Sequence, residues 1–372
     1  MIIIFVCVYA ISKNEEKFAL RWAESMKEAD EIYVLDTGST DNTVNLLKSA
    51  GVNVSSKVID PWRFDTARNE SLALVPENAD ICVCTDLDEV FHPGWRKKME
   101  EAWKNGVTRL KYRYTWSFLP DGSEGTVFWI DKAHLRKNYK WVNPVHEILS
   151  FSGKEKILNA PGVQIDHLAD GKKSRAQYLP LLELAVKENP ENDRNMHYLG
   201  REYMFNKRYE EAIKVLKHHL ELKSAVWKDE RCASMRYIAK CYASLNNFSE
   251  AYKYHLLSIC EAPYLREPWM DAAYFEYRRE NWMGTAYFIE YALDIKERTE
   301  SYITEADCWN ANPYDVLSIA YYKLGDIHNA IKNVKKAIVI SKEQRLRDNL
   351  QIYEKEFAEK GDGDTNAEVN LK

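Results

Sequence analysis

The chain has 372 residues, enough for two domains with separate hydrophobic cores. Its formal net charge of −5 excludes bulk nucleic-acid binding, which needs a concentrated basic face. The 7 cysteines are scattered and lie mostly in apolar runs, which indicates buried, reduced thiols in a cytoplasmic protein. The apolar run at the start is too short for a signal peptide, and no stretch approaches the roughly 20 residues of a membrane helix. No integral membrane segment is therefore expected.

Strands and helices alternate along the first half of the chain. Apolar runs at 2–8, 31–36, 52–59 and 81–83 predict buried strands, and helical patterns separate them. This alternation predicts an α/β fold with a mostly parallel, Rossmann-like sheet. Ligands of such sheets bind beyond the carboxyl ends of the strands, so polar residues at those ends should meet in one crevice. The residues expected there are Ala10, Asp36, Asp86 and Asp88.

The most informative stretch is Asp86-Leu87-Asp88, which follows an apolar run. Alternate residues of an extended chain point to opposite faces, so the two aspartates can share a face while Leu87 turns into the core. Two such carboxylates suit Mg²⁺ or Mn²⁺, and an ion of this kind usually also binds substrate phosphates. The alternative is a helix start, in which Asp88 or Glu89 caps a helix beginning near 93–94.

A change of period follows the first strands. Residues 109–116 alternate polar and apolar side chains, and a turn at 120–122 leads into a second run at 126–130. This pattern predicts a hairpin with one exposed face. Its aromatic residues either line an acceptor site or are ordinary strand aromatics; they are Tyr112, Tyr114, Trp116 and Trp129.

The second half is helical and repetitive. A tyrosine is followed nine residues later by an alanine in four places, which are Tyr203–Ala212, Tyr242–Ala251, Tyr277–Ala286 and Tyr321–Ala330. This pattern resembles the tetratricopeptide repeat and predicts four helical hairpins. Such an array offers a concave surface for a peptide or protein, offers a dimer contact, or only supports the first domain.

These patterns divide the chain into four parts. We expect an α/β domain at 1–170, a connecting helix at 171–192, an all-α repeat domain at 193–358 and a disordered tail at 359–372.

Four segments of the first domain occur in the order of a known motif set. They are Ala10-Ile-Ser-Lys-Asn-Glu15, Leu35-Asp36-Thr-Gly-Ser-Thr-Asp-Asn-Thr43, Phe64-Asp65-x-x-Arg68-Asn69 and Asp86-Leu87-Asp88-Glu89. This set resembles that of family 2 glycosyltransferases, across roughly the first 170 residues. The resemblance implies a GT-A fold and transfer of a sugar from a nucleotide-sugar with inversion.

The resemblance also implies roles for single residues. The nucleotide-sugar site would comprise Ala10, Asn14, Glu15, Asp36, Ser39, Asp65, Arg68 and Asp86. Asp88 would act in catalysis through a bound Mn²⁺ or Mg²⁺, which stabilises the diphosphate leaving group as a Lewis acid.

Family members that carry a helical repeat domain show a Val-His-Glu segment and a later histidine at a strand end, as at 145–147 and His167 here. His167 is the candidate third metal ligand, since imidazole completes carboxylate sites. Glu147 is the candidate general base, with Glu89 and Asp166 as competitors. Its structural alternative is an ion pair with Arg136 or Lys140.

The predicted function is a metal-dependent, inverting transfer of sugar from a UDP-sugar to an acceptor. The architecture is similar to that of bacterial enzymes that glycosylate cysteine or serine in bacteriocin peptides, which implies a peptide or protein acceptor. The alternatives are a glycan acceptor in cell-surface assembly, and a non-catalytic repeat scaffold on a degenerate sugar-nucleotide domain. A homodimer through the repeat domain is a further option.

Overall fold

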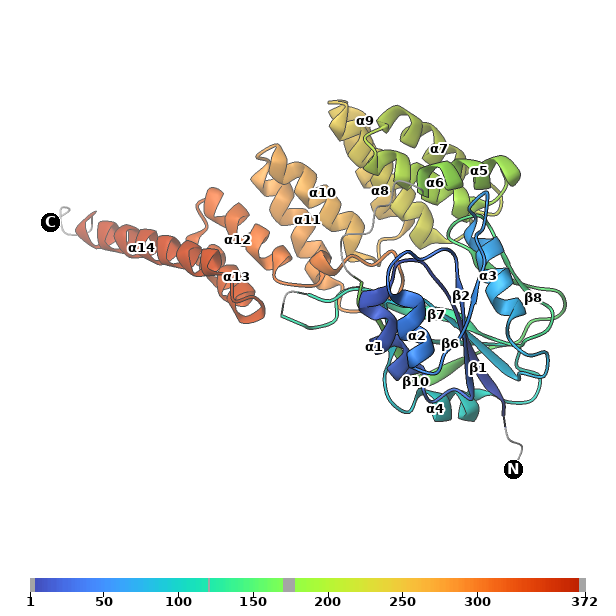
Figure 1. The fold of residues 1–372 in the computed structure, drawn as a ribbon. Helices are drawn as coiled ribbons and strands as arrows, with labels where there is room; N and C mark the ends of the chain where they lie inside the picture. The colour runs from blue at the N-terminus through green and yellow to red at the C-terminus, as the bar shows by residue number, and fades with distance from the viewer. Residues whose placement is uncertain (1–3, 120, 170–177, 368–372) are drawn as a thin grey trace. The chain divides into compact units, whose positions relative to one another are not determined.

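The computed structural model describes residues 4–119, 121–169 and 178–367. The chain forms two compact units, the first comprising residues 1–195 and 300–302 and the second comprising 196–299 and 303 onward. Figure 1 traces the α/β elements of the first unit and the helices of the second.

The first unit is built on a mixed sheet. Among the described residues the sheet has eight strands in the order β3-β2-β1-β4-β7-β6-β10-β5. Their bounds are β1 Val6–Ser12, β2 Glu31–Asp36, β3 Asn53–Ser56, β4 Ile81–Thr85, β5 Glu89–Phe91, β6 Arg109–Thr115, β7 Val127–His134 and β10 Ile157–His167. Pairing is parallel for β3–β2, β2–β1, β1–β4 and β6–β10, and antiparallel for the other three contacts. The predicted α/β sheet is therefore confirmed, with antiparallel strands inserted beyond β4.

Alternation along β1 divides the core between the two faces of the sheet. Val6 and Val8 pack with α1 (Glu16–Met26), α2 (Thr43–Ser49) and α4 (Trp95–Ala102). Cys7 and Tyr9 face the other side. That side is covered by α3 (Phe64–Ala73) and by the hairpin of β8 (Tyr139–Val142) and β9 (Ile148–Phe151).

Two local expectations are corrected by the structure. The first strand runs to Ser12, because Ile11 and Ser12 continue the parallel pairing with Leu35 and Asp36. The helix-cap alternative for Asp88 and Glu89 is wrong, because Glu89 begins β5. The first N–H groups of α4 instead donate to the carboxylate of Glu28.

A buried polar chain links the sheet to the β8–β9 hairpin. The hydroxyl of Tyr9 lies 2.7 Å from Nε2 of His134 and accepts a hydrogen bond from Nε1 of Trp141 at 2.8 Å. His134 is fully buried, and this burial lowers its pKa to about 3. The folded state therefore holds a neutral imidazole where the unfolded chain, below about pH 6.5, holds a charged one.

We expect His134→Gln to weaken the pH dependence of stability. The unfolded state binds the extra proton between about pH 6.5 and 3, so wild-type stability falls on acidification by up to about 1.4 kcal/mol per pH unit from this group. Urea unfolding at pH 7 and pH 5 gives the free energy of unfolding at each pH. An equal change in this free energy between the two pH values for variant and wild type would contradict the prediction.

The second unit contains the predicted repeats. Four helical hairpins are present among the described residues, and the predicted alanines at their crossings are 0–7% exposed. A side chain at Gly200 would meet Leu216 at 2.4 Å, so α6 and α7 approach too closely for any larger residue. The pairs are α6 (Asp193–Phe205) with α7 (Tyr209–Glu221), α8 (Lys228–Ser244) with α9 (Phe248–Glu261), α10 (Arg266–Arg278) with α11 (Trp282–Asp294), and α12 (Asn312–Lys323) with α13 (Ile327–Ile340).

The remaining segments border the repeats. Helix α5 (Tyr178–Glu188) lies in the predicted connecting segment, of which residues 171–177 are outside the described part. The short helix η1 (Ala306–Cys308) lies between α11 and α12. Helix α14 (Gln344–Ala367) continues into the stretch predicted as a disordered tail, whose residues 368–372 are not described. Within the described residues, no helix is both long and apolar enough to cross a bilayer.

Candidate active site

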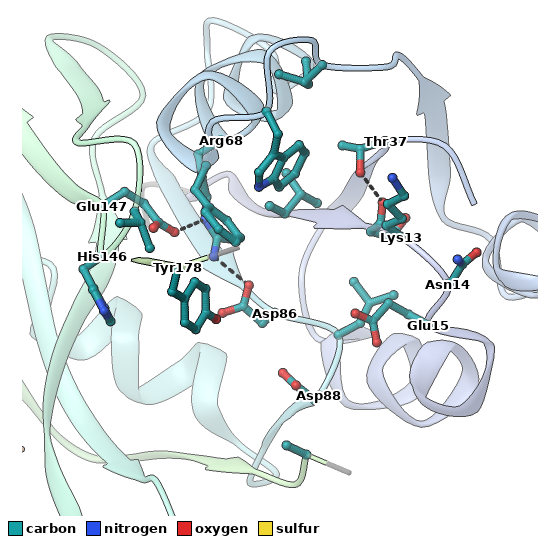
Figure 2. A pocket seen from close by; sticks show the side chains of 18 of the residues that line it. Lys13, Asn14, Glu15, Thr37, Arg68, Asp86, Asp88, His146, Glu147 and Tyr178 are labelled. Carbon is teal, nitrogen blue, oxygen red and sulfur yellow. Dashed lines mark hydrogen bonds and ion pairs between the residues drawn. The ribbon is translucent and has the colours of Figure 1, made fainter. Parts of the chain in front are cut away.

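A cavity of about 1010 Å³ lies in the first unit at the carboxyl ends of β1 and β4. Figure 2 shows Asn14 and Glu15 on one side of it, Glu147 and Tyr178 on the other, and Asp86 and Asp88 between them. The predicted residues that line it are Asn14, Glu15, Arg68, Asp86, Asp88, Glu147 and His167. This edge of the sheet is where the strand order predicts a ligand site.

The turn after β4 presents the two aspartates. Strand β4 is fully buried, and the turn closes on itself, since Glu89 N–H donates to the Asp86 carbonyl and Asp86 N–H donates to the Glu89 carboxylate. Leu87 is 2% exposed and packs in the core, as predicted, but the turn directs it there, since residues 86–88 are not extended chain.

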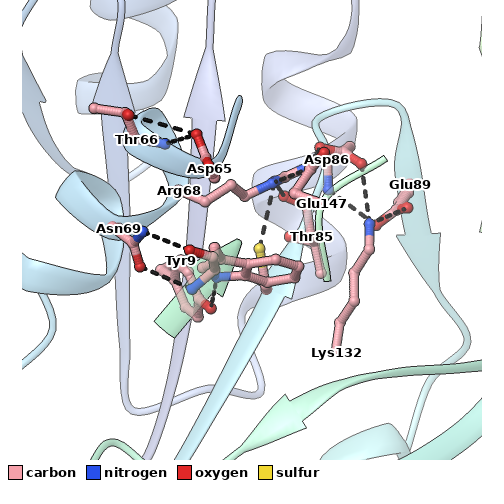
Figure 3. A network of polar contacts seen from close by, with 12 residues as sticks. Tyr9, Asp65, Thr66, Arg68, Asn69, Thr85, Asp86, Glu89, Lys132 and Glu147 are labelled. Atoms are coloured by element: carbon pink, nitrogen blue, oxygen red, sulfur yellow. Dashed lines mark hydrogen bonds and ion pairs between the residues drawn. The ribbon is translucent and has the colours of Figure 1, made fainter. Parts of the chain in front are cut away.

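Asp86 is held by two cations (Figure 3). Its Oδ1 accepts from Nη2 of Arg68 at 2.6 Å, and its Oδ2 accepts from Nζ of Lys132 at 3.1 Å. Burial would raise the pKa of Asp86, but Arg68 and Lys132 together lower it far below its ordinary value. Asp86 is therefore a fixed anion whose side chain, 36% exposed, borders the cavity while its two cationic partners are largely buried.

Asp88 and His167 form a second pair in the cavity. Nε2 of His167 lies 3.6 Å from Oδ2 of Asp88, and its Nδ1 lies 3.1 Å from the Trp116 carbonyl. The imidazole also stacks on the Trp116 ring, with centroids 4.3 Å apart. Burial disfavours the charged imidazole, but the neighbouring carboxylate of Asp88 raises the pKa of His167.

This pair offers two of the side-chain types that bind divalent cations. In the described part of the chain, no group of three or more histidine, cysteine or acidic side chains gathers closely enough to hold a metal ion. The Nδ1–H of His167 is occupied by the Trp116 carbonyl, so Nε2 is the nitrogen that would be available to a metal.

Glu147 lies opposite Asn14 and Glu15 in Figure 2, and its Oε1 accepts from Nε of Arg68 at 2.8 Å. The ion-pair partner of Glu147 is therefore Arg68 and not Arg136 or Lys140. The Nε of Arg136 donates to the Val75 carbonyl instead. The competing bases do not line the cavity. Glu89 is 1% exposed, and its burial raises its pKa.

Asp166, the third candidate, faces away from this chemistry. Its Oδ2 lies 2.8 Å from Nε2 of His92, and its Oδ1 accepts from Gln164. Of the three carboxylates considered as base, only Glu147 borders the cavity.

Four predicted residues lie outside the cavity lining: Ala10, Asp36, Ser39 and Asp65. Ala10 is fully buried inside β1. Asp36 accepts from the N–H groups of Gly38 and Ser39 and from both nearby serine hydroxyls, so its carboxylate shapes the loop that follows β2. Asp65 pairs with Arg63 at 2.8 Å. The roles assigned to these four stay predictions.

Sequence reasoning missed Lys132 and the aromatic wall of the cavity. Lys132 lies in β7, and a lysine inside a strand that begins with four apolar residues was the available signal. The wall comprises Trp62, Phe64 and Tyr178, which lie in no common motif. Of the hairpin aromatics, Tyr114 and Trp116 line the cavity, whereas Tyr112 is fully buried in the core and Trp129 donates to Glu300.

Comparison with known proteins agrees with the two units. Residues 7–147 match the family described as Glycosyl transferase family 2, and residues 194–225 match Tetratricopeptide repeat. The chain therefore carries a family 2 glycosyltransferase domain followed by tetratricopeptide-type repeats. No curated protein matches the chain.

Three solved structures are each similar to a little under half of the chain. MamA from Desulfovibrio magneticus RS-1 has 12% identity and a TM-score of 0.36, over 45% of this chain and 86% of that one. Pseudomonas aeruginosa pilF has 14% identity and a TM-score of 0.37, over 48% and 72%. A thermophilic TPR protein of Thermus thermophilus has 14% identity and a TM-score of 0.35, over 47% and 88%.

Proposed function

We propose that this protein is a metal-dependent, inverting glycosyltransferase that moves a sugar from a UDP-sugar to an acceptor. The observation that carries the proposal is the cavity at the carboxyl ends of β1 and β4, inside a family 2 glycosyltransferase domain. Asn14 and Glu15 border the part assigned to the nucleotide, and Asp88 borders the part assigned to the diphosphate.

Charge supports the need for a cation. Carboxylates outnumber lysine and arginine four to two among the residues that line the cavity: Glu15, Asp86, Asp88 and Glu147 against Lys13 and Arg68. A diphosphate would be repelled by this excess unless a divalent ion lay between them. Asp88 and His167 would hold Mn²⁺ or Mg²⁺, and such an ion stabilises the charge that develops on the leaving diphosphate.

The protein's own groups account for the remaining steps. Glu147 takes the proton of the acceptor group as that group attacks the sugar. Its Oε1 is engaged by Arg68, and among the described residues its Oε2 has no hydrogen-bond partner, which leaves that oxygen to face the acceptor. Trp62, Phe64 and Tyr178 give the cavity an apolar wall that excludes water and contacts the acceptor.

The acceptor we propose is a peptide or protein side chain, cysteine or serine, bound with the help of the repeat unit. Helical repeats of this type form extended surfaces for peptide chains. A glycan acceptor is the alternative, and both would use the same base.

We expect purified protein to release UDP from at least one of UDP-glucose, UDP-galactose and UDP-N-acetylglucosamine in Mn²⁺, and to lose this release in EDTA. GDP-glucose is the matched control for UDP-glucose, since it offers the same sugar and diphosphate with a different base. Release that persists in EDTA would contradict the metal requirement. Absence of release from all three donors, together with absence of UDP binding, would favour the non-catalytic scaffold.

A further inference from the structure

The segment from Trp141 to Glu147 is attached to helix α3 at three points. Asn69 contacts the backbone of Trp141, the N–H of Phe64 donates to the Pro144 carbonyl at 3.0 Å, and Arg68 pairs with Glu147. These three α3 residues lie within six positions of one helix, so a single rigid element determines where the segment runs.

The segment needs such support because its backbone is unusual. Asn143 has a φ of 81° and His146 a φ of 49°, and neither is glycine. Residues other than glycine adopt this left-handed region at a cost, and they stay there only when surrounding contacts fix them. His146 itself and the next residue, Glu147, both line the cavity.

Asn69 makes the most specific of the three attachments. Its Nδ2 donates to the Trp141 carbonyl at 2.9 Å, and its Oδ1 accepts from the Trp141 N–H at 2.9 Å. Trp141 belongs to β8, whose other edge pairs with β9. The side-chain amide of Asn69 therefore satisfies the backbone groups that β9 does not reach, and it fixes β8 in register with α3.

We propose that Asn69 is a positioning residue for the transfer reaction, acting through the Trp141 backbone to place Glu147 against the acceptor. The inference rests on the proposed function, because it assumes that Glu147 is the base. Asn69 does not line the cavity, so its effect on rate has to pass through the segment that it holds. A small displacement of a base costs a large factor in rate even when binding is unaffected.

The test is a double-mutant cycle on UDP release in Mn²⁺, in which water takes the place of the acceptor and loses its proton to Glu147, with UDP affinity measured by calorimetry. Asn69→Leu should lower kcat about 10- to 100-fold and leave the Kd for UDP within about twofold. Glu147→Gln should lower kcat about 100-fold or more. The double variant should be no slower than Glu147→Gln alone, since Asn69 then has no base left to position.

The controls separate the inference from the function that it rests on. Asn333→Leu removes a nearly buried asparagine that donates to the Asn329 carbonyl in α13, and it should leave kcat unchanged. If Asn69→Leu fails to bind UDP, Asn69→Asp replaces it, since this change keeps the acceptor for Trp141 N–H. If the double variant lost kcat by the product of the two single losses, the two residues would act independently. That result would overturn the positioning role of Asn69 and leave the proposed function intact. Full activity of Glu147→Gln would overturn the base assignment, and absence of wild-type release together with absence of UDP binding would overturn the function.

Discussion

Asp88→Ala should remove most of the Mn²⁺-dependent part of UDP binding, weakening the affinity in Mn²⁺ on the order of 100-fold. The physical reason is that Asp88 supplies the carboxylate of a two-residue site, and a hard cation held by so few protein ligands depends on each of them. In EDTA the substitution should no longer weaken UDP binding. The cavity then carries one carboxylate fewer, so the variant should bind UDP at least as well as the wild type.

Calorimetry with UDP, with Mn²⁺ and with EDTA, measures both effects. Asp166→Ala is the matched control, because it removes a neighbouring carboxylate that pairs with His92 and does not line the cavity. A general loss of folding would lower binding under both conditions, which separates it from loss of the ion. Unchanged Mn²⁺-dependent binding in Asp88→Ala would refute the metal assignment.

The features that sequence predicted best depend on local patterns. The repeats were recognisable because Ala212 and its equivalents lie where two helices pack and only a small side chain fits. The burial of Leu87 was also predicted, but from alternation along extended chain, whereas residues 86–89 form a turn that directs Leu87 into the core. Parallel strands with helical crossovers also follow from local periodicity.

The features that it missed depend on contacts between distant segments. Lys132 reaches Asp86 only because β7 is inserted beside β4, and no local pattern specifies that strand order. Arg68 and Glu147 are 79 positions apart, so the motif that contains Arg68 gave no sign of this pair. Ala10 was placed at a strand end, but pairing with β2 extends β1 by two residues beyond it. Tertiary pairing decided each of these cases.

Arg68 connects the parts of the site, and its removal should have the largest effect on stability. Its guanidinium is 4% exposed and contacts Asp86, Glu147 and the Thr85 carbonyl. Arg68→Met would leave Glu147 without this partner and would leave Asp86, whose side chain is 36% exposed, with Lys132 alone. The cost should be about 2–3 kcal/mol, below the range for a fully buried pair. Arg68→Lys should restore little, because an ammonium cannot make the forked contacts of a guanidinium. Hydrogen exchange of the β4 and α3 amides measures the loss in the unit where it arises.

The pH dependence identifies the cause. Arg68 lowers the pKa of Asp86, so its contribution to stability is present above about pH 4 and is lost as the pH falls further. The difference in the free energy of unfolding between wild type and Arg68→Met should therefore become smaller in acid. Arg63→Met is the control at the start of the same helix, since Arg63 is 24% exposed and its pairs with Asp65 and Glu188 should contribute about 1 kcal/mol or less. The role of Arg68 would be contradicted if both variants lost the same amount of stability, or if the stability lost in Arg68→Met did not change with pH. Either result would mean that Arg68 does not stabilise the charges of Asp86 and Glu147.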